Sequence, residues 1–423
     1  MVVPRQMPGR WATVRIHVRL PWHDGAGVGR RRSSERGPTP GGLSMAPTPP
    51  AGTPDQVRTW WAGLGDEERR HYVEDMPAAI GGLDGVPSLA RHYANTRLLD
   101  AYIERTGDLD AVRLREEFRA SGGLLLLFVP PSTVGGTDTR VAISYNDPDH
   151  AVATSVLVPG TATNTRSPKY LNHALDFVRR LRDRADSYTD LGDNAAVFWL
   201  GYKSPDLLVP DAMSARYARD GHAALTSFLG GLRAANVRGE QRGPTTLIGY
   251  SYGSTVVGHA AAAADLTKVV DTVLIAGSPG LGRHIRSVED LGFTPDRFLV
   301  AASPIDPVVR TPSFVHGTNP AHPSFRATLV ETGTIGHLGY GTEGTPAFLN
   351  AVYIVTGDLD RVTKVPAARA AGTQVARLGD WFGSRVGRRS DPEQATAADA
   401  GARPRPPGRG AHRPRGRSGR PRL

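Results

Sequence analysis

From residue 122 onward, short apolar runs alternate with longer amphipathic stretches, and this alternation constrains the fold more than any other feature. The runs have the length of strands and are rich in aliphatic residues. They are 124–129, 141–145, 153–158, 195–200, 245–250, 272–276, 297–302 and 328–331. The first three follow one another closely, which predicts at least one antiparallel pair, whereas helix-like segments separate the later runs. These segments are 168–185, 213–234, 253–265 and 345–356. An α/β fold follows, with a mostly parallel central sheet of about eight strands flanked by helices.

The rest of the chain divides by composition. Residues 52–121 carry apolar side chains at helical spacing, which predicts a helical N-terminal segment ahead of an α/β domain over 122–366. Residues 1–51 and 367–423 are rich in Arg, Pro and Gly, a composition typical of disordered segments. Met45 precedes the first globular-looking segment and is a candidate for the true translation start.

The net charge of +10 belongs to the two ends of the chain. Residues 1–44 have a net charge of +6 and residues 367–423 a net charge of +9, so the body between them is acidic by five charges. Clustered Arg side chains can contact anionic surfaces. The last forty residues contain no Phe, Trp or Tyr to stack on bases. We therefore expect no specific nucleic-acid partner.

The chain contains no cysteine, which excludes disulfides and thiolate metal sites. No apolar run approaches the ~20 residues of a membrane-spanning helix. The N-terminus also lacks the apolar core of a signal peptide. These features favour a cytoplasmic location with no transmembrane segment.

The pentapeptide Gly-Tyr-Ser-Tyr-Gly at 249–253 predicts a nucleophilic serine, Ser251. In a nucleophile elbow, serine occupies a strained turn between a strand and a helix, and flanking glycines prevent clashes. A chain with 49 Gly can hold this pattern by chance, so its context decides. Residues 245–248 form a predicted strand and residues 254–264 a predicted helix of small side chains, as an elbow requires.

A serine nucleophile needs a base and an acid that orients the base. In the α/β-hydrolase fold, the acid follows one later strand and the base follows a strand after that. Asp306 follows the predicted strand 297–302, and Asp296 is the weaker alternative. His337 follows the last predicted strand. His316 and His322 compete with it but precede that strand. We therefore predict that Asp306 orients His337 and that His337 transfers the proton.

An oxyanion hole in this fold uses the amide after the nucleophile and an amide from the loop after the third strand. Tyr252 supplies the first predicted donor. In the loop 158–163 we predict Thr161 as the second, with Ala162 as the alternative. An ordinary loop with a helix cap would have the same sequence, because a backbone donor leaves little side-chain signature.

Lids in this fold are often inserted between the sixth and seventh strands, here only residues 277–296. So short a stretch leaves little room for a large cap. Our hypothesis is that the helical region 53–120 covers the site instead.

The chain resembles an actinobacterial α/β-hydrolase family catalogued as a domain of unknown function, over about residues 52–358. The motifs that carry the resemblance are 59–64, 80–87, 146–149, 156–161, 199–202, 249–258 and 276–280. The resemblance implies a hydrolase of unknown substrate with Ser251, Asp306 and His337 as its triad. One departure is that Tyr340 is followed by Gly341, where the family pattern leads us to expect a tryptophan.

The sequence therefore predicts a serine hydrolase that cleaves an ester or related acyl bond of a small-molecule substrate through an acyl-enzyme. We expect no cofactor and no metal. The alternative is a non-catalytic α/β-hydrolase-like scaffold that binds a small ligand or a partner.

Overall fold

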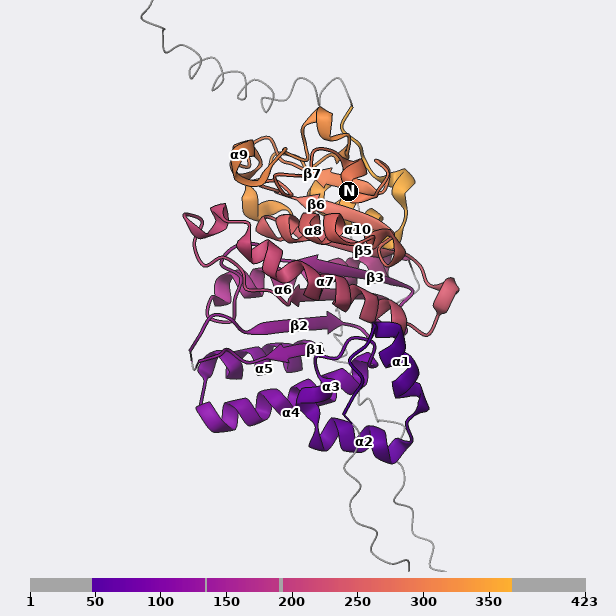
Figure 1. Cartoon of the computed structure of the whole chain (residues 1–423). Helices are drawn as coiled ribbons and strands as arrows, with labels where there is room; N and C mark the ends of the chain where they lie inside the picture. Colours follow the sequence, from indigo (N-terminus) through magenta and orange to yellow (C-terminus); the bar gives the residue numbers. More distant parts are fainter. Residues whose placement is uncertain (1–47, 134, 190–192, 367–423) are drawn as a thin grey trace, which may run out of the picture. The chain divides into compact units, whose positions relative to one another are not determined.

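The computed structural model describes residues 48–133, 135–189 and 193–366 (Figure 1). Residues 1–47 of the segment 1–51 predicted to be disordered, and the whole of the tail 367–423 predicted to be disordered, lie outside these residues. Eight strands form one sheet in the order β1-β2-β4-β3-β5-β6-β7-β8. They are β1 (Leu124–Val129), β2 (Arg140–Tyr145), β3 (Ala153–Val158), β4 (Asn194–Leu200), β5 (Thr245–Tyr250), β6 (Thr272–Ala276), β7 (Phe298–Ala301) and β8 (Thr328–Val330). Strand β2 is antiparallel to both β1 and β4, and the other neighbours are parallel, which confirms the predicted class of sheet.

Helices cover both faces of the sheet. The longer ones that follow strands are α6 (Pro168–Thr189), α7 (Arg216–Ala235), α8 (Tyr252–Ala263) and α10 (Pro346–Thr356). Helix α6 packs with α10, and α7 packs with α8. Successive residues of a strand face opposite sides of a sheet. Gly249 of β5 lies against Ser254 of α8, whereas Ile248 shares a cavity with side chains of α6 and α10. The two helix pairs therefore lie on opposite faces.

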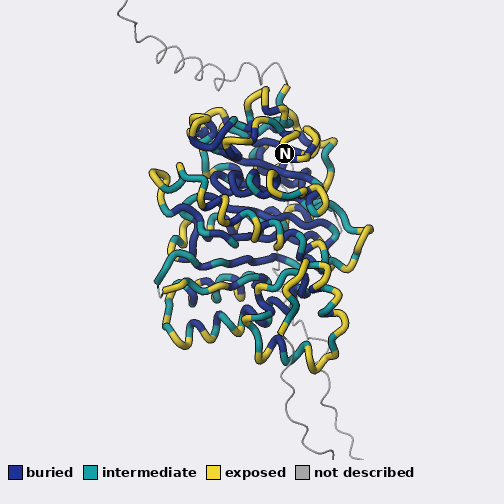
Figure 2. Tube along the Cα trace, in the orientation of Figure 1, coloured by how far each residue is buried: buried dark blue, intermediate teal, exposed yellow. Residues whose placement is uncertain are grey.

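The central strands form the core of the molecule. Every residue of β3, β4, β6 and β7 is buried, and the strands are the dark-blue interior of Figure 2. Strands covered on both faces need apolar side chains throughout, which is why these segments are continuous apolar runs in the sequence. Within the described residues, no helix has the length and apolar character needed to cross a membrane.

The N-terminal segment packs against the edge strand β1 and against α7. It contains α1 (Pro54–Gly63), α2 (Asp66–Asp75), α3 (Pro77–Ile80), α4 (Ser88–Thr106) and α5 (Leu109–Ser121). Helix α1 packs against α7, and α4 packs beside β1 (Figure 1). Its Asn95 side chain donates to Leu125 O (3.2 Å) and accepts from Phe128 N (3.1 Å), while His92 Nδ1 accepts from Leu125 N (2.9 Å). These side chains pair backbone groups that an exposed edge strand would leave open to another chain.

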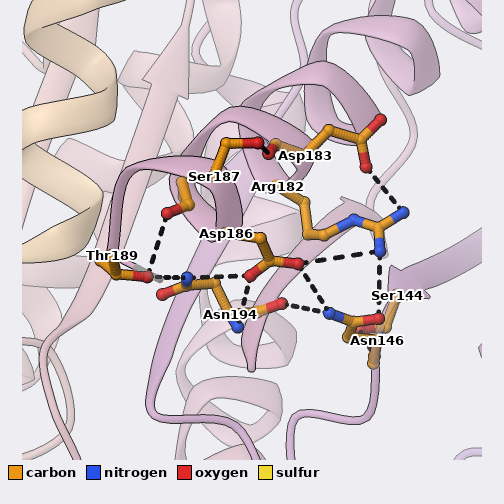
Figure 3. Close-up of polar contacts among 9 residues, drawn as sticks. Ser144, Asn146, Arg182, Asp183, Asp186, Ser187, Thr189 and Asn194 are labelled. Carbon is orange, nitrogen blue, oxygen red and sulfur yellow. Dashed lines mark hydrogen bonds and ion pairs between the residues drawn. The ribbon is translucent and has the colours of Figure 1, made fainter. Parts of the chain in front are cut away.

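A polar network fixes the amino end of β4 (Figure 3). Asp186 near the end of α6 accepts hydrogen bonds from the backbone N and from Nδ2 of Asn194 (2.8 and 2.9 Å). Asn146, which follows β2, donates to Asn194 O and accepts from Arg182. The network joins three elements at the end of the sheet opposite the carboxyl end of β5, where Ser251 lies. We therefore assign this network a structural role.

Candidate active site

Ser251 occupies the turn between β5 and α8 with φ 53° and ψ −130°, a conformation that L-residues rarely adopt. Its N–H donates to Ala276 O at 2.9 Å, which ties the turn to the end of β6. A Cβ on Gly253 would lie 2.1 Å from Val158 O, and one on Gly249 would lie 2.8 Å from the Cα of Ser254. Both flanking positions thus require glycine, because α8 begins in contact with the ends of β3 and β5.

The structure brings Ser251, Asp306 and His337 together from three loops at the carboxyl end of the sheet. His337 Nε2 lies 2.9 Å from Ser251 Oγ, and His337 Nδ1 lies 2.9 Å from Asp306 Oδ2. A carboxylate only accepts hydrogen bonds, so Nδ1 carries the proton in this pair. In the neutral imidazole, Nε2 is then the acceptor for the serine hydroxyl.

Asp306 is fully buried and accepts hydrogen bonds from three directions. Besides His337, the donors are the Val308 amide (2.8 Å, to Oδ1) and the Tyr340 hydroxyl (2.9 Å, to Oδ2). Burial alone would raise the pKa of the Asp306 carboxyl, but these hydrogen bonds and the charge of His337 outweigh it and hold the pKa below its ordinary value. The group is therefore a carboxylate near neutral pH.

Tyr340 belongs to the site, although the sequence analysis gave it no role there. Its hydroxyl accepts from the Ser303 amide (2.9 Å) while donating to Asp306, so it links the loops after β7 and β8. Burial, followed by the charge of Asp306, raises the pKa of the phenol and keeps it a donor. Gly277 (φ 58°) was also missed: a Cβ there would lie 3.0 Å from Asp306 Oδ2 and 3.1 Å from His337 Cε1.

Tyr250, the first tyrosine of the pentapeptide, holds the histidine loop. Its ring stacks on the His337 imidazole with centroids 5.2 Å apart and planes 21° apart. Its hydroxyl donates to His337 O at 2.8 Å. The elbow pattern leaves this position free, so only the structure assigns it a contact.

The two residues predicted to supply the oxyanion-hole amides, Tyr252 and Thr161, are in the turn after Ser251, where α8 begins, and in the lining of the cavity at Ser251, respectively. The loop approaches closely, since a Cβ on Gly160 would lie 2.5 Å from Ser251 Cβ. The alternative donor, Ala162, already donates its N–H to Pro205 O at 2.8 Å. This bond favours Thr161 over Ala162.

The alternative acid and bases do not reach the serine. Asp296 is exposed, with its carboxylate 3.6 Å from Arg297 Nε. His316 is buried, and its Nε2 bonds to Ala212 O. His322 Nδ1 bonds to Ser324 Oγ at 2.7 Å. Only His337 among these histidines contacts both Ser251 and Asp306.

Ser251 and His337 open into a cavity of about 750 Å³. Its walls come from α6, α10, the strand ends and the loop 206–209, and none of its lining residues belongs to the N-terminal helices. The hypothesis that residues 53–120 cover the site is therefore wrong, because α4 packs beside β1 and α1 packs against α7, away from the cavity. Beside His337, a Cβ on Gly341 would lie 2.7 Å from Cδ2 of Phe177, so the Phe177 ring occupies the wall next to this glycine.

Among the described residues, no group of three or more His, Asp or Glu side chains is arranged to hold a metal ion. Residues 135–316 match a protein family described as alpha/beta hydrolase. Two uncharacterized proteins of Mycobacterium tuberculosis are each 28% identical to the chain in an alignment of length 328, and the match covers 69% of this chain and 49% of the relative. The chain thus spans about half the length of the curated relatives it matches.

Among solved structures, the chain is similar to a serine hydrolase of Xanthomonas campestris described as lacking a lid. Identity is 16%, the match covers 56% of this chain and 92% of that one, and the TM-score is 0.32. It is also similar to a fungal esterase from Rhizomucor miehei, at 13% identity, covering 63% of this chain and 96% of that one, with a TM-score of 0.33.

Proposed function

We propose that the protein is a serine hydrolase that cleaves an ester or related acyl bond, and the match of residues 135–316 to an alpha/beta hydrolase family supports this proposal. The observation that carries the proposal is the continuous chain of hydrogen bonds from Ser251 through His337 to Asp306, with 2.9 Å at each step. A serine hydroxyl is a weak nucleophile until a base accepts its proton. This arrangement supplies that base and orients it.

In the proposed reaction, Ser251 Oγ attacks the substrate's acyl carbon as His337 Nε2 takes its proton. The negative charge that develops on the carbonyl oxygen is stabilised by the amides of Tyr252 and Thr161. Asp306 stabilises the resulting imidazolium and keeps the ring in place. His337 then protonates the departing alcohol, leaving an acyl-enzyme on Ser251. A water molecule, deprotonated by the same histidine, releases the acid and restores the serine.

A fluorophosphonate probe tests this proposal, because it reacts only with an activated serine. We expect stoichiometric labelling of the full chain, with the label located on Ser251 by mass spectrometry and lost in Ser251→Ala. His337→Ala should slow labelling at least about 100-fold, since general-base catalysis contributes at least that much. The matched control is Ser187→Ala on the exposed surface of α6, which should label like the wild type.

Folded protein that fails to label at Ser251 would contradict the proposal. That outcome would favour the alternative of a non-catalytic scaffold that binds a small ligand or partner. Circular dichroism of each variant separates a loss of reactivity from a loss of folding.

A further inference from the structure

The cavity at Ser251 has two chemically different parts. Its polar lining residues include Ser251, His337, Thr161, His173 and Asp206, and all of these except Ser251 are partly exposed. Its interior is apolar and lies inside the molecule, since the residues lining it are each no more than 7% exposed. These residues are Leu157, Ala174, Ile248, Leu274, Ala347 and Ala351.

The interior extends below the serine along the sheet. Leu157, Ile248 and Leu274 are register partners on three neighbouring strands, so they form one row across the sheet. Ile248 precedes Ser251 by three residues, which corresponds to a depth of about 10 Å along β5. Ala174 of α6 and Ala347 of α10 line the opposite wall. The cavity is therefore a slot between the sheet and the α6–α10 layer.

Small side chains keep this slot open. Protein interiors are normally packed without voids larger than a water molecule. Here Ala174, Ala347 and Ala351 stand where the two helices face the sheet, and Ala276 and Ala301 stand at the ends of β6 and β7. Larger aliphatic residues at these positions would fill the space. An apolar slot of this kind offers no hydrogen-bond partner to a polar group and suits a hydrocarbon chain.

The exposed part of the cavity also carries apolar side chains. Leu207, Leu208 and Val209, in the loop between β4 and α7, line it while being 58%, 69% and 69% exposed. Leu338, next to His337, is 44% exposed and also lines it. Isolated exposed apolar residues are common, but here four of them line one cavity. These side chains favour entry of an apolar chain.

We propose that the slot binds the acyl part of the substrate as an extended hydrocarbon chain, and that the enzyme selects acyl chains of about eight carbons over acetyl groups. This inference rests on the proposed function of Ser251. The carbonyl carbon lies at Ser251 and the chain extends past Ile248 toward Ala351. Each buried methylene contributes to binding in the transition state, so kcat/KM rises about threefold for each CH₂ until the slot is filled.

The test measures kcat/KM for p-nitrophenyl esters from acetate to dodecanoate with the full chain. We expect octanoate to exceed acetate by at least about 100-fold and longer chains to gain nothing further. Ala351→Leu and Ala174→Leu should each lower the octanoate-to-acetate ratio by at least about tenfold, because their side chains take up the space of the chain. The ratio of the two kcat/KM values does not depend on the fraction of enzyme that is folded, so a loss of stability in a variant does not change it.

The control is Ala185→Leu, which places the same bulk at a buried alanine of α6 remote from the serine. It should leave the ratio unchanged even if it lowers stability. A wild type that prefers acetate, or slot variants that retain the wild-type ratio, would overturn the inference while leaving Ser251 labelling intact.

A second measurement does not depend on turnover. Ser251→Ala should bind octanoate but not acetate in calorimetric titrations, and adding Ala351→Leu should weaken octanoate binding at least about tenfold. Equal affinity for the two acids, or octanoate binding that is unaffected by Ala351→Leu, would contradict the slot even if no ester were hydrolysed.

Discussion

At the scale of single residues, the most informative contact is the one that secures Asp306. A buried carboxylate must have its oxygens hydrogen-bonded to remain charged. The Tyr340 hydroxyl provides one of these bonds and simultaneously accepts from Ser303 N, which fixes it between two loops. Tyr340 does not contact the reacting atoms and is therefore a positioning residue, acting through Asp306 on His337.

Tyr340→Phe should lower kcat about tenfold with little change in KM, because loss of a hydrogen bond to a charged group costs about 1.5–3 kcal/mol and part of that loss is felt when His337 becomes charged. Steady-state kinetics with a p-nitrophenyl ester measure both parameters. The matched control is Tyr188→Phe, which removes a hydroxyl bonded to Asp358 on another part of the molecule. A fall confined to KM, or an equal fall in Tyr188→Phe, would argue against a positioning role.

Whether a site residue could be predicted depends on how far along the sequence the residues that identify it lie. Ser251 is marked by its immediate neighbours, and Asp306 and His337 each follow a strand that is visible in the sequence. Tyr340 bonds to a carboxylate 34 positions earlier, and Gly277 is constrained by side chains from two other loops. Nothing near either residue in the sequence indicates such contacts.

At the scale of secondary-structure elements, the contact between α8 and β3 sets the position of the serine. The strands could be predicted to within about a residue or two because fully covered strands are continuous apolar runs. Their order could not: β4 lies between β2 and β3, and the residues of an apolar run do not specify which strands will be its neighbours. The close contact between α8 and Val158 could not be predicted either, because the glycines of an elbow do not indicate which backbone atoms they will contact.

Gly253→Ala should lower the free energy of unfolding by about 1–3 kcal/mol, because its Cβ would lie 2.1 Å from a backbone oxygen and α8 must move. Urea denaturation of both proteins measures the difference. Gly63→Ala is the control: it ends α1, no atom lies within 4 Å of the added Cβ, and it should leave stability equal or slightly higher. Gly253→Ala with wild-type stability would mean that the close approach is not maintained in solution.

At the scale of the whole molecule, the N-terminal helices are part of one structure with the sheet. Leu99, Leu114 and Phe118 belong to the same apolar cluster as the central strands. The sequence predicted these helices but not their location, because their apolar faces would suit a lid as well as an edge strand. The cavity was equally unpredictable, as it depends on five alanines from four elements facing one another. Both features arise only from tertiary packing.

His92 makes the attachment of these helices sensitive to acid. Its Nδ1 must be unprotonated to accept from Leu125 N, and burial, followed by the charge of Arg119, lowers its pKa from 6.5 to about 4. Between these values the unfolded chain binds more protons than the folded one, so the free energy of unfolding falls as pH drops from about 6.5 toward 4.

Replacing the imidazole with a group that does not titrate should therefore flatten this dependence. His92→Gln keeps an oxygen that can accept from Leu125 N but removes the proton-binding site. Urea denaturation at pH 7 and pH 5 should show a loss of stability on acidification that is smaller in the variant by about 1–2 kcal/mol. Equal losses in the two proteins would show that other groups govern acid unfolding. A smaller loss in the variant, with the wild-type His92 ring neutral at pH 5 by NMR, would locate the acid sensitivity at the junction of α4 and β1.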